Sequence, residues 1–142
     1  MSPAREENLI LCNAPLVGGA LEPSPEQVKA IIDATADAGF GGASLWAFHH
    51  NAAVAAGTSP EQVKEWHTDR GLSVPVVESL IGWEGGDAAT IEAQCGPTFE
   101  VATYYGAQAV AGVVMGAEID RAAAALGGGG GRPAGAGGGG SH

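Results

Sequence analysis

A small set of chemically capable side chains follows the short apolar runs of this sequence. Asn13 lies within the first run, the pair His49 and His50 ends the second, and Glu78 and Trp83 lie at or after the end of the third. Imidazole binds metal ions or moves protons near neutral pH, and a carboxylate in an apolar strand needs solvent, a partner or a cation. We therefore assign Glu78 and His49 as candidate catalytic residues. His50, Asn13 and Trp83 are candidate substrate-binding residues.

Each assignment has a structural alternative. Neighbouring strand residues point to opposite sides, so at most one of His49 and His50 is expected to face a pocket. Glu78 is equally consistent with a loop carboxylate beside the core, and Trp83 with a packing residue rather than an apolar wall for a sugar. Cys12 fits a small buried thiol better than a nucleophile, and Trp46 is expected in the core or on a helix face.

The apolar runs have the length and composition of buried strands, at residues 9–16, 43–49, 74–80 and 109–115. The hexapeptide SPEQVK begins at Ser24 and again at Ser59. Each copy predicts a helix start, with serine as the cap, proline in the first turn and glutamine three residues after the cap. These helices are expected to end near Gly39 and Gly71.

The segment between the third and fourth runs contains Gly96-Pro97, which predicts a break. We expect a short helix from Ala88 and a main helix from Pro97 to Gly106. Glu118 follows the fourth run as a further polar candidate, and another helix is expected to start at Asp120.

Strand and helix thus alternate four times, which predicts an α/β fold with a parallel sheet. Residues 1–126 are expected to form this domain. The glycine-rich segment 127–142 offers no large apolar side chain to offset the entropy of ordering it, so we predict a disordered tail.

Composition excludes several classes of function. Lys and Arg number 6 against 16 Asp and Glu, and a net charge of −10 argues against nucleic acid as a partner. No apolar run is long enough for a membrane span, and the first residues do not resemble a secretory signal, so we expect a cytoplasmic protein. Cys12 and Cys95 lack zinc-site spacing and are expected to be free thiols.

Four segments resemble the xylose-isomerase-like TIM barrels, a superfamily of sugar phosphate isomerases and epimerases that also contains endonuclease-IV-type enzymes. They are NLILCNAPL, SPEQVKAIIDATADAGFGGASLWAFHH, GLSVPVVESLIGW and TFEVATYYGAQAVAGVVMG. The resemblance implies a sugar or sugar phosphate substrate, a divalent metal (Mn, Mg, Co or Zn) and proton transfer beside a carbonyl. The family's metal ligands follow later strands, and Met115 stands where relatives often carry histidine, so metal ligands here stay unassigned.

A complete barrel has eight strands and about 250 residues, so the resemblance implies a partial barrel of four βα units, an N-terminal half. We expect a truncated isomerase or epimerase with little activity alone, or a homodimer in which two halves complete a barrel. The alternative is a non-catalytic βα module for binding or oligomerisation. An endonuclease-IV-type DNA repair enzyme is disfavoured by the charge.

Overall fold

The computed structural model describes residues 9–18, 20–83 and 85–113. Its elements alternate between strand and helix along the chain, with a second helix after the second strand. They are β1 (Ile10–Cys12), the short 3-10 helix η2 (Ala14–Val17), α1 (Pro25–Asp37), β2 (Gly42–Trp46), α2 (Ala47–Ala55), α3 (Pro60–Thr68), β3 (Ser73–Leu80), α4 (Ala88–Tyr105) and β4 (Ala109–Gly112). All neighbouring strands pair in parallel, in the order β1-β2-β3-β4. The predicted α/β fold with a parallel βα repeat is confirmed.

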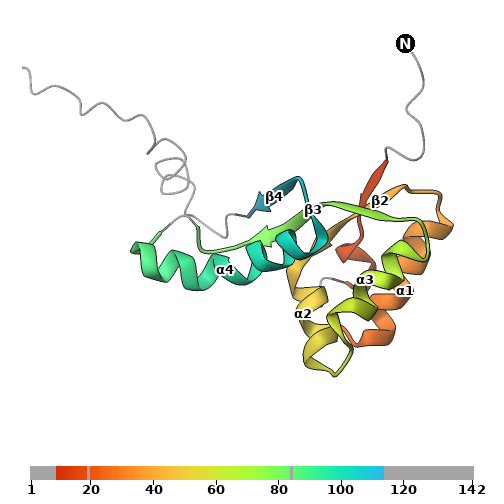
Figure 1. Ribbon diagram of the computed structural model, residues 1–142, viewed down its shortest axis with the longest axis horizontal. Coiled ribbons are helices and arrows are strands. Elements are labelled where there is room, and N and C mark those ends of the chain that lie inside the picture. Colours follow the sequence, from red (N-terminus) through yellow and green to blue (C-terminus); the bar gives the residue numbers. More distant parts are fainter. Residues whose placement is uncertain (1–8, 19, 84, 114–142) are drawn as a thin grey trace, which may run out of the picture.

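The helices α1 to α4 lie on one side of the sheet (Figure 1). Leu45 of β2 and Val77 of β3 are in register and pack with Val101 and Ala102 of α4 in one buried cluster. A second cluster joins α1, α2 and α3 through residues such as Val28, Ala53 and Val63. Because alternate strand residues point to opposite faces, the neighbours of Leu45 and Val77 point away from these helices. We call that side the open face; among the residues described, no helix covers it.

The two SPEQVK segments both start helices, as predicted. Ser24 accepts a hydrogen bond from the Gln27 backbone, and Gln27 returns one by accepting from the Ser24 backbone, a complete capping box. Ser59 likewise accepts from the Gln62 backbone at 3.1 Å. Both helices end close to the expected glycines, Gly39 and Gly71, which have positive φ angles of 88° and 69°.

The predicted boundaries of the second strand and of the helix after the third strand are wrong. The run 43–49 is strand only to Trp46, and α2 begins at the next residue without a side-chain cap or an intervening turn. His49 and His50 therefore lie on a helix, not at a strand end. Residues 88–105 form one helix through Pro97 rather than two. Gly96 precedes the proline, and without a Cβ it avoids the clash that normally disfavours helical geometry before proline.

The first strand is also shorter than expected. Residues 9–16 were predicted as strand, whereas β1 ends at Cys12 and Ala14–Val17 form the 3-10 helix. Pro15 favours this early end, because it has no N–H to donate to a strand ladder.

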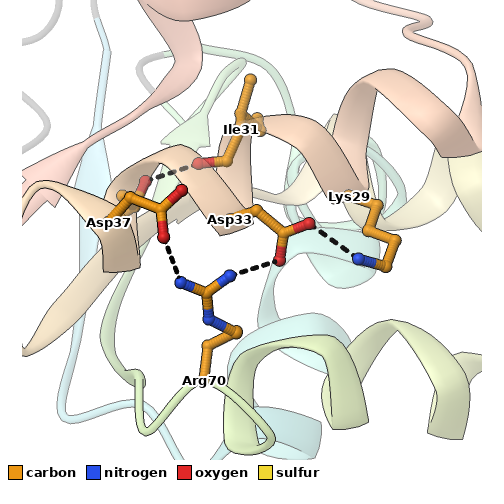
Figure 2. A network of polar contacts seen from close by, with 6 residues as sticks. Lys29, Ile31, Asp33, Asp37 and Arg70 are labelled. Carbon is orange, nitrogen blue, oxygen red and sulfur yellow. Dashed lines mark hydrogen bonds and ion pairs between the residues drawn. The ribbon is translucent and has the colours of Figure 1, made fainter.

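A charged network on the surface ties α1 to the turn after α3 (Figure 2). Lys29 binds Asp33 at 2.7 Å one turn along the helix, and Arg70 contacts Asp33 at 3.3 Å and also Asp37. The hydrogen bond and charge of Lys29, with those of Arg70, lower the pKa of Asp33. These side chains are largely exposed, so they orient the two helices more than they stabilise the fold.

No helix in the described part of the chain is long and apolar enough to cross a membrane. The predicted boundary at residue 126, the tail 127–142, Met115, Glu118 and the helix start at Asp120 lie outside the described residues.

Candidate functional site

Glu78 is the centre of a polar cluster on the open face. Its Oε2 accepts hydrogen bonds from the Cys12 thiol and from the indole Nε1–H of Trp46, each at 2.9 Å. Cys12 ends β1, Trp46 ends β2 and Glu78 lies near the end of β3, so three adjacent parallel strands each supply one side chain at their carboxyl ends. Ligands of parallel α/β sheets bind at that edge.

Strand register explains why these residues meet. Trp46 is paired with Glu78, and Cys12 is paired with Ser44, two residues before Trp46. Side chains in register on parallel neighbours share a face, and so do residues two apart on one strand. All four side chains therefore lie on the open face. Glu78 is also the one charged residue in the four strands as the structure describes them.

The surroundings of the cluster shift the pKa of the Cys12 thiol. Burial, the hydrogen bond to Glu78 and the charge of that carboxylate raise the pKa of the Cys12 thiol. Cys12 therefore holds its proton near neutral pH, and Glu78 accepts rather than donates. Both donors use Oε2, so neither of these hydrogen bonds occupies Oε1. Cys12 is exposed and Glu78 is half-buried, which leaves the pair within reach of a ligand.

The backbone beside the carboxylate is strained. Ser79 has φ 73°, the one non-glycine residue with positive φ among those described, and it is 3% exposed. The β3–β4 ladder shifts register between Glu78 and Leu80 at the same point. A left-handed conformation costs a non-glycine residue about 1–3 kcal/mol, and such strain clusters at functional sites. The irregularity ends regular pairing directly after Glu78.

Ser44 provides a second polar feature of the open face. The residue is 6% exposed and its hydroxyl has no hydrogen-bond partner within the described structure. A buried hydroxyl without a partner is costly, and such groups often mark a site that a ligand or water completes. Its register partner is Cys12, so the unpaired hydroxyl belongs to the same cluster.

His49 lies beside this cluster but not in it. Its ring is 5.6 Å from that of Trp46, and its Nε2 lies 3.2 Å from the carbonyl oxygen of Ala20. A carbonyl only accepts, so Nε2 carries the proton in this arrangement. The side chain is fully buried, and burial lowers its pKa. His49 thus supports Trp46, and it belongs to α2 rather than to a strand of the sheet.

His50 faces the helical layer. Its Nδ1 lies 2.8 Å from the hydroxyl of Tyr105 on α4, and its ring also contacts Tyr104. It is 5% exposed, and burial lowers its pKa. His50 therefore does not join Glu78. Both histidines are buried on α2, so the structure places neither of them at the carboxyl end of a strand.

Asn13 and Trp83 lie apart from the carboxylate. Asn13 is fully buried and donates to the Thr35 hydroxyl at 3.3 Å, which joins η2 to α1. Trp83 is half-buried against β4: a Cβ on Gly112 would lie 2.8 Å from its Nε1, so only glycine fits there. That nitrogen is buried and has no hydrogen-bond partner among the residues that the structure describes.

The structure thus brings Glu78 together with Cys12 and Trp46, which the sequence does not predict as site residues. Cys12 is exposed instead of buried, and Trp46 lies on the open face instead of in the core or on a helix face. A signal for Trp46 is present in the sequence. Side chains alternate between the two faces of a strand, so a buried Leu45 places Ser44 and Trp46 on the face opposite the core.

A metal site does not fit the described residues. No three His, Cys, Asp or Glu side chains among them are arranged to hold an ion. Catalytic metal sites in proteins typically use three protein ligands, and the cluster offers one thiol and one carboxylate. The divalent metal implied by the resemblance stays a prediction.

No family model, curated protein or solved structure matches the chain in comparisons with known proteins.

Proposed function

We propose that this chain acts on a small carbohydrate-like carbonyl compound, as an isomerase or epimerase that moves a proton at the carbon beside the carbonyl. The observation that carries the proposal is the setting of Glu78. Its carboxylate is fixed by two donors on Oε2 at the ligand-binding edge of a parallel sheet, and Oε1 remains available as a base. The resemblance to sugar isomerases supports the same chemistry.

The described charges favour an uncharged sugar over a sugar phosphate. Lys29 lies on α1, Lys64 on α3 and Arg70 just after α3, all on the helical side of the sheet. Phosphate recognition usually draws on such cations or on helix N-termini. The open face instead supplies thiol, hydroxyl and indole groups. No step of the proposed reaction passes through a metal.

Cys12 and Cys95 form no disulfide bond within the described residues. Cysteines that are not disulfide-bonded are typical of a reducing compartment, which supports the cytoplasm as the location of this activity.

The test is solvent exchange in deuterium oxide, followed by proton NMR across a panel of unphosphorylated and phosphorylated aldoses and ketoses. The wild type is expected to exchange the C–H beside the carbonyl of an uncharged sugar. Glu78→Gln keeps the shape but removes the base, so its exchange rate should fall about 10²-fold or more. Glu92→Gln, an exposed change on α4, serves as the matched control.

Absence of exchange in the wild type, or equal rates for wild type and Glu78→Gln, would overturn the proposal. Exchange confined to phosphorylated sugars would reject only the preference for an uncharged substrate.

A second candidate function is a βα module that associates through its sheet. The observation that favours it comes from the described residues, whose helices cover one face of the sheet and whose outer strands, β1 and β4, each pair on one side only. Unpaired strand edges and uncovered apolar sheet faces are typical association surfaces.

A further inference from the structure

The thiol of Cys12 has chemical properties that complement those of Glu78. Its Sγ is 2.9 Å from Oε2, and it reaches the carboxylate across the end of β2. Glu78 accepts this bond, so the thiol is the hydrogen-bond donor of the pair and the carboxylate oxygen is the acceptor. A donor and an acceptor of different chemistry in one site can take separate acid and base roles.

The exposure of Cys12 and the positions of Cys12 and Glu78 on the sheet favour the same assignment of acid and base. Cys12 is exposed, and it lies at the carboxyl end of β1 while Glu78 lies near that of β3. A small ligand on the open face over β2 would contact both groups. Ser44 lies on β2 in register with Cys12, and its buried hydroxyl has no hydrogen-bond partner among the described residues.

We propose that Cys12 is a second catalytic residue, the acid that works with the Glu78 base on a substrate held over β2. This inference rests on the proposed function and names the group that protonates the substrate oxygen. It also defines the substrate class as a hydroxy-aldehyde or hydroxy-ketone, because the Glu78 carboxylate must contact a C–H group and the Cys12 thiol an oxygen on the adjacent carbon.

The proton balance closes without a co-reactant. Glu78 takes the proton from the carbon beside the carbonyl, the C–H electron pair forms the carbon–carbon double bond, and the carbonyl oxygen takes the proton of the Cys12 thiol. The result is an enediol, a neutral carboxylic acid and a thiolate. The thiolate then takes the proton of the other enediol hydroxyl, and Glu78 returns its proton to the neighbouring carbon.

The first experiment measures the thiol itself and needs no substrate. Iodoacetamide alkylation is followed across a pH series, with peptide mapping to separate Cys12 from the buried Cys95. Glu78→Gln removes the charge that raises the thiol pKa, so the Cys12 alkylation profile should move to lower pH, whereas Glu92→Gln should leave it unchanged. Identical profiles for wild type and Glu78→Gln would overturn the pairing.

The second experiment repeats the deuterium exchange with Cys12→Ser, whose hydroxyl is a much weaker acid than the thiol. We expect exchange to fall by about 10²-fold, with unchanged thermal unfolding. Cys95→Ser is the control and should exchange at the wild-type rate.

The outcomes separate the two proposals. If Glu78→Gln loses exchange and Cys12→Ser retains it, the role of Cys12 is wrong and the role of Glu78 stands. If the wild type exchanges no sugar, both fall. If Cys12→Ser unfolds at a much lower temperature, the alkylation profiles of folded wild type and Glu78→Gln decide the pairing.

Discussion

At the scale of single residues, His67 makes the stability of the fold depend on pH. The ring is 1% exposed, Nδ1 lies 3.0 Å from the Val63 carbonyl oxygen, and Nε2 is buried with no hydrogen-bond partner in the described part of the chain. Protonation would place an unpaired charge there. Burial, with a smaller contribution from His50, therefore lowers the pKa of His67 despite the bond to Val63.

The direction of the pH effect follows from this shift. The unfolded chain binds a proton near the ordinary value of 6.5, while folded His67 resists it to lower pH. Stability is then complete above about pH 6.5 and falls below it, by about 1.4 kcal/mol per pH unit for one such group, until the folded pKa is reached. Urea unfolding from pH 7.5 to 5 measures the slope.

His67→Phe should flatten that slope, because the ring packing against Tyr105 remains and the titration is gone. The slope should not vanish, since His49 and His50 also have lowered pKa values. Trp66→Phe on the same helix is the control and should keep the wild-type slope. An unchanged slope in His67→Phe would show that this histidine is not the acid-sensitive group.

At the scale of residues, the sequence predicts correctly where the chemistry of one side chain decides its surroundings. A carboxylate in an apolar strand needs partners, and Glu78 has two. The partners themselves depend on strand register, which the sequence does not state, so the expectations that Trp46 lies in the core or on a helix face and that Cys12 is buried are wrong. The expected positions of His49 and His50 are wrong because β2 ends at Trp46 and α2 begins at the next residue.

At the scale of elements, the repeated hexapeptide provides a matched experiment. Gln27 Oε1 accepts from the Ser24 backbone at 2.9 Å, which completes the capping box of α1. In α3 the cap consists of the bond from the Gln62 backbone to the Ser59 side chain. The same glutamine in the same six-residue sequence therefore has a side-chain bond in one copy, while the other copy shows only the backbone bond.

Gln27→Ala should destabilise the protein by about 0.5–1 kcal/mol, and Gln62→Ala by less than half of that. Helix propensity cancels in the comparison, because both changes replace glutamine with alanine at the third helical position. Chemical unfolding of both variants gives the difference directly. Equal losses would mean that the two caps are energetically the same.

Element prediction succeeded where local signals are strong and failed where they are weak. Ser-Pro caps mark α1 and α3 in the sequence. The start of α2 has no cap and no turn residue, since Trp46 ends β2 and Ala47 begins the helix. The apolar run 43–49 is therefore predicted as a single strand. At Gly96-Pro97 the sequence predicts a break that the structure does not have. The helix continues because the glycine before the proline has no Cβ to clash with the proline ring.

At the scale of the whole molecule, the sheet requires cover on its open face. Parallel sheets are normally buried on both sides, and the described helices lie on one side only (Figure 1). Apart from Glu78 the four strands carry no charge, and Leu9 and Ile10 at the β1 edge are 44% and 37% exposed. A two-fold axis along the strands would set β4 of one copy beside β1 of another in parallel, as in a closed eight-stranded barrel.

We therefore expect the purified chain to self-associate, with a dimer that grows with concentration in light scattering. Ala109→Lys puts a charge on the exposed edge strand β4, in register with Val76 of the open face, and should shift the population toward monomer. Ala89→Lys, exposed on α4, is the matched control and should not. Because the charge per chain is −10, added salt should strengthen the dimer by screening repulsion. A monomer at every concentration and salt level would show that the open face does not recruit a second copy.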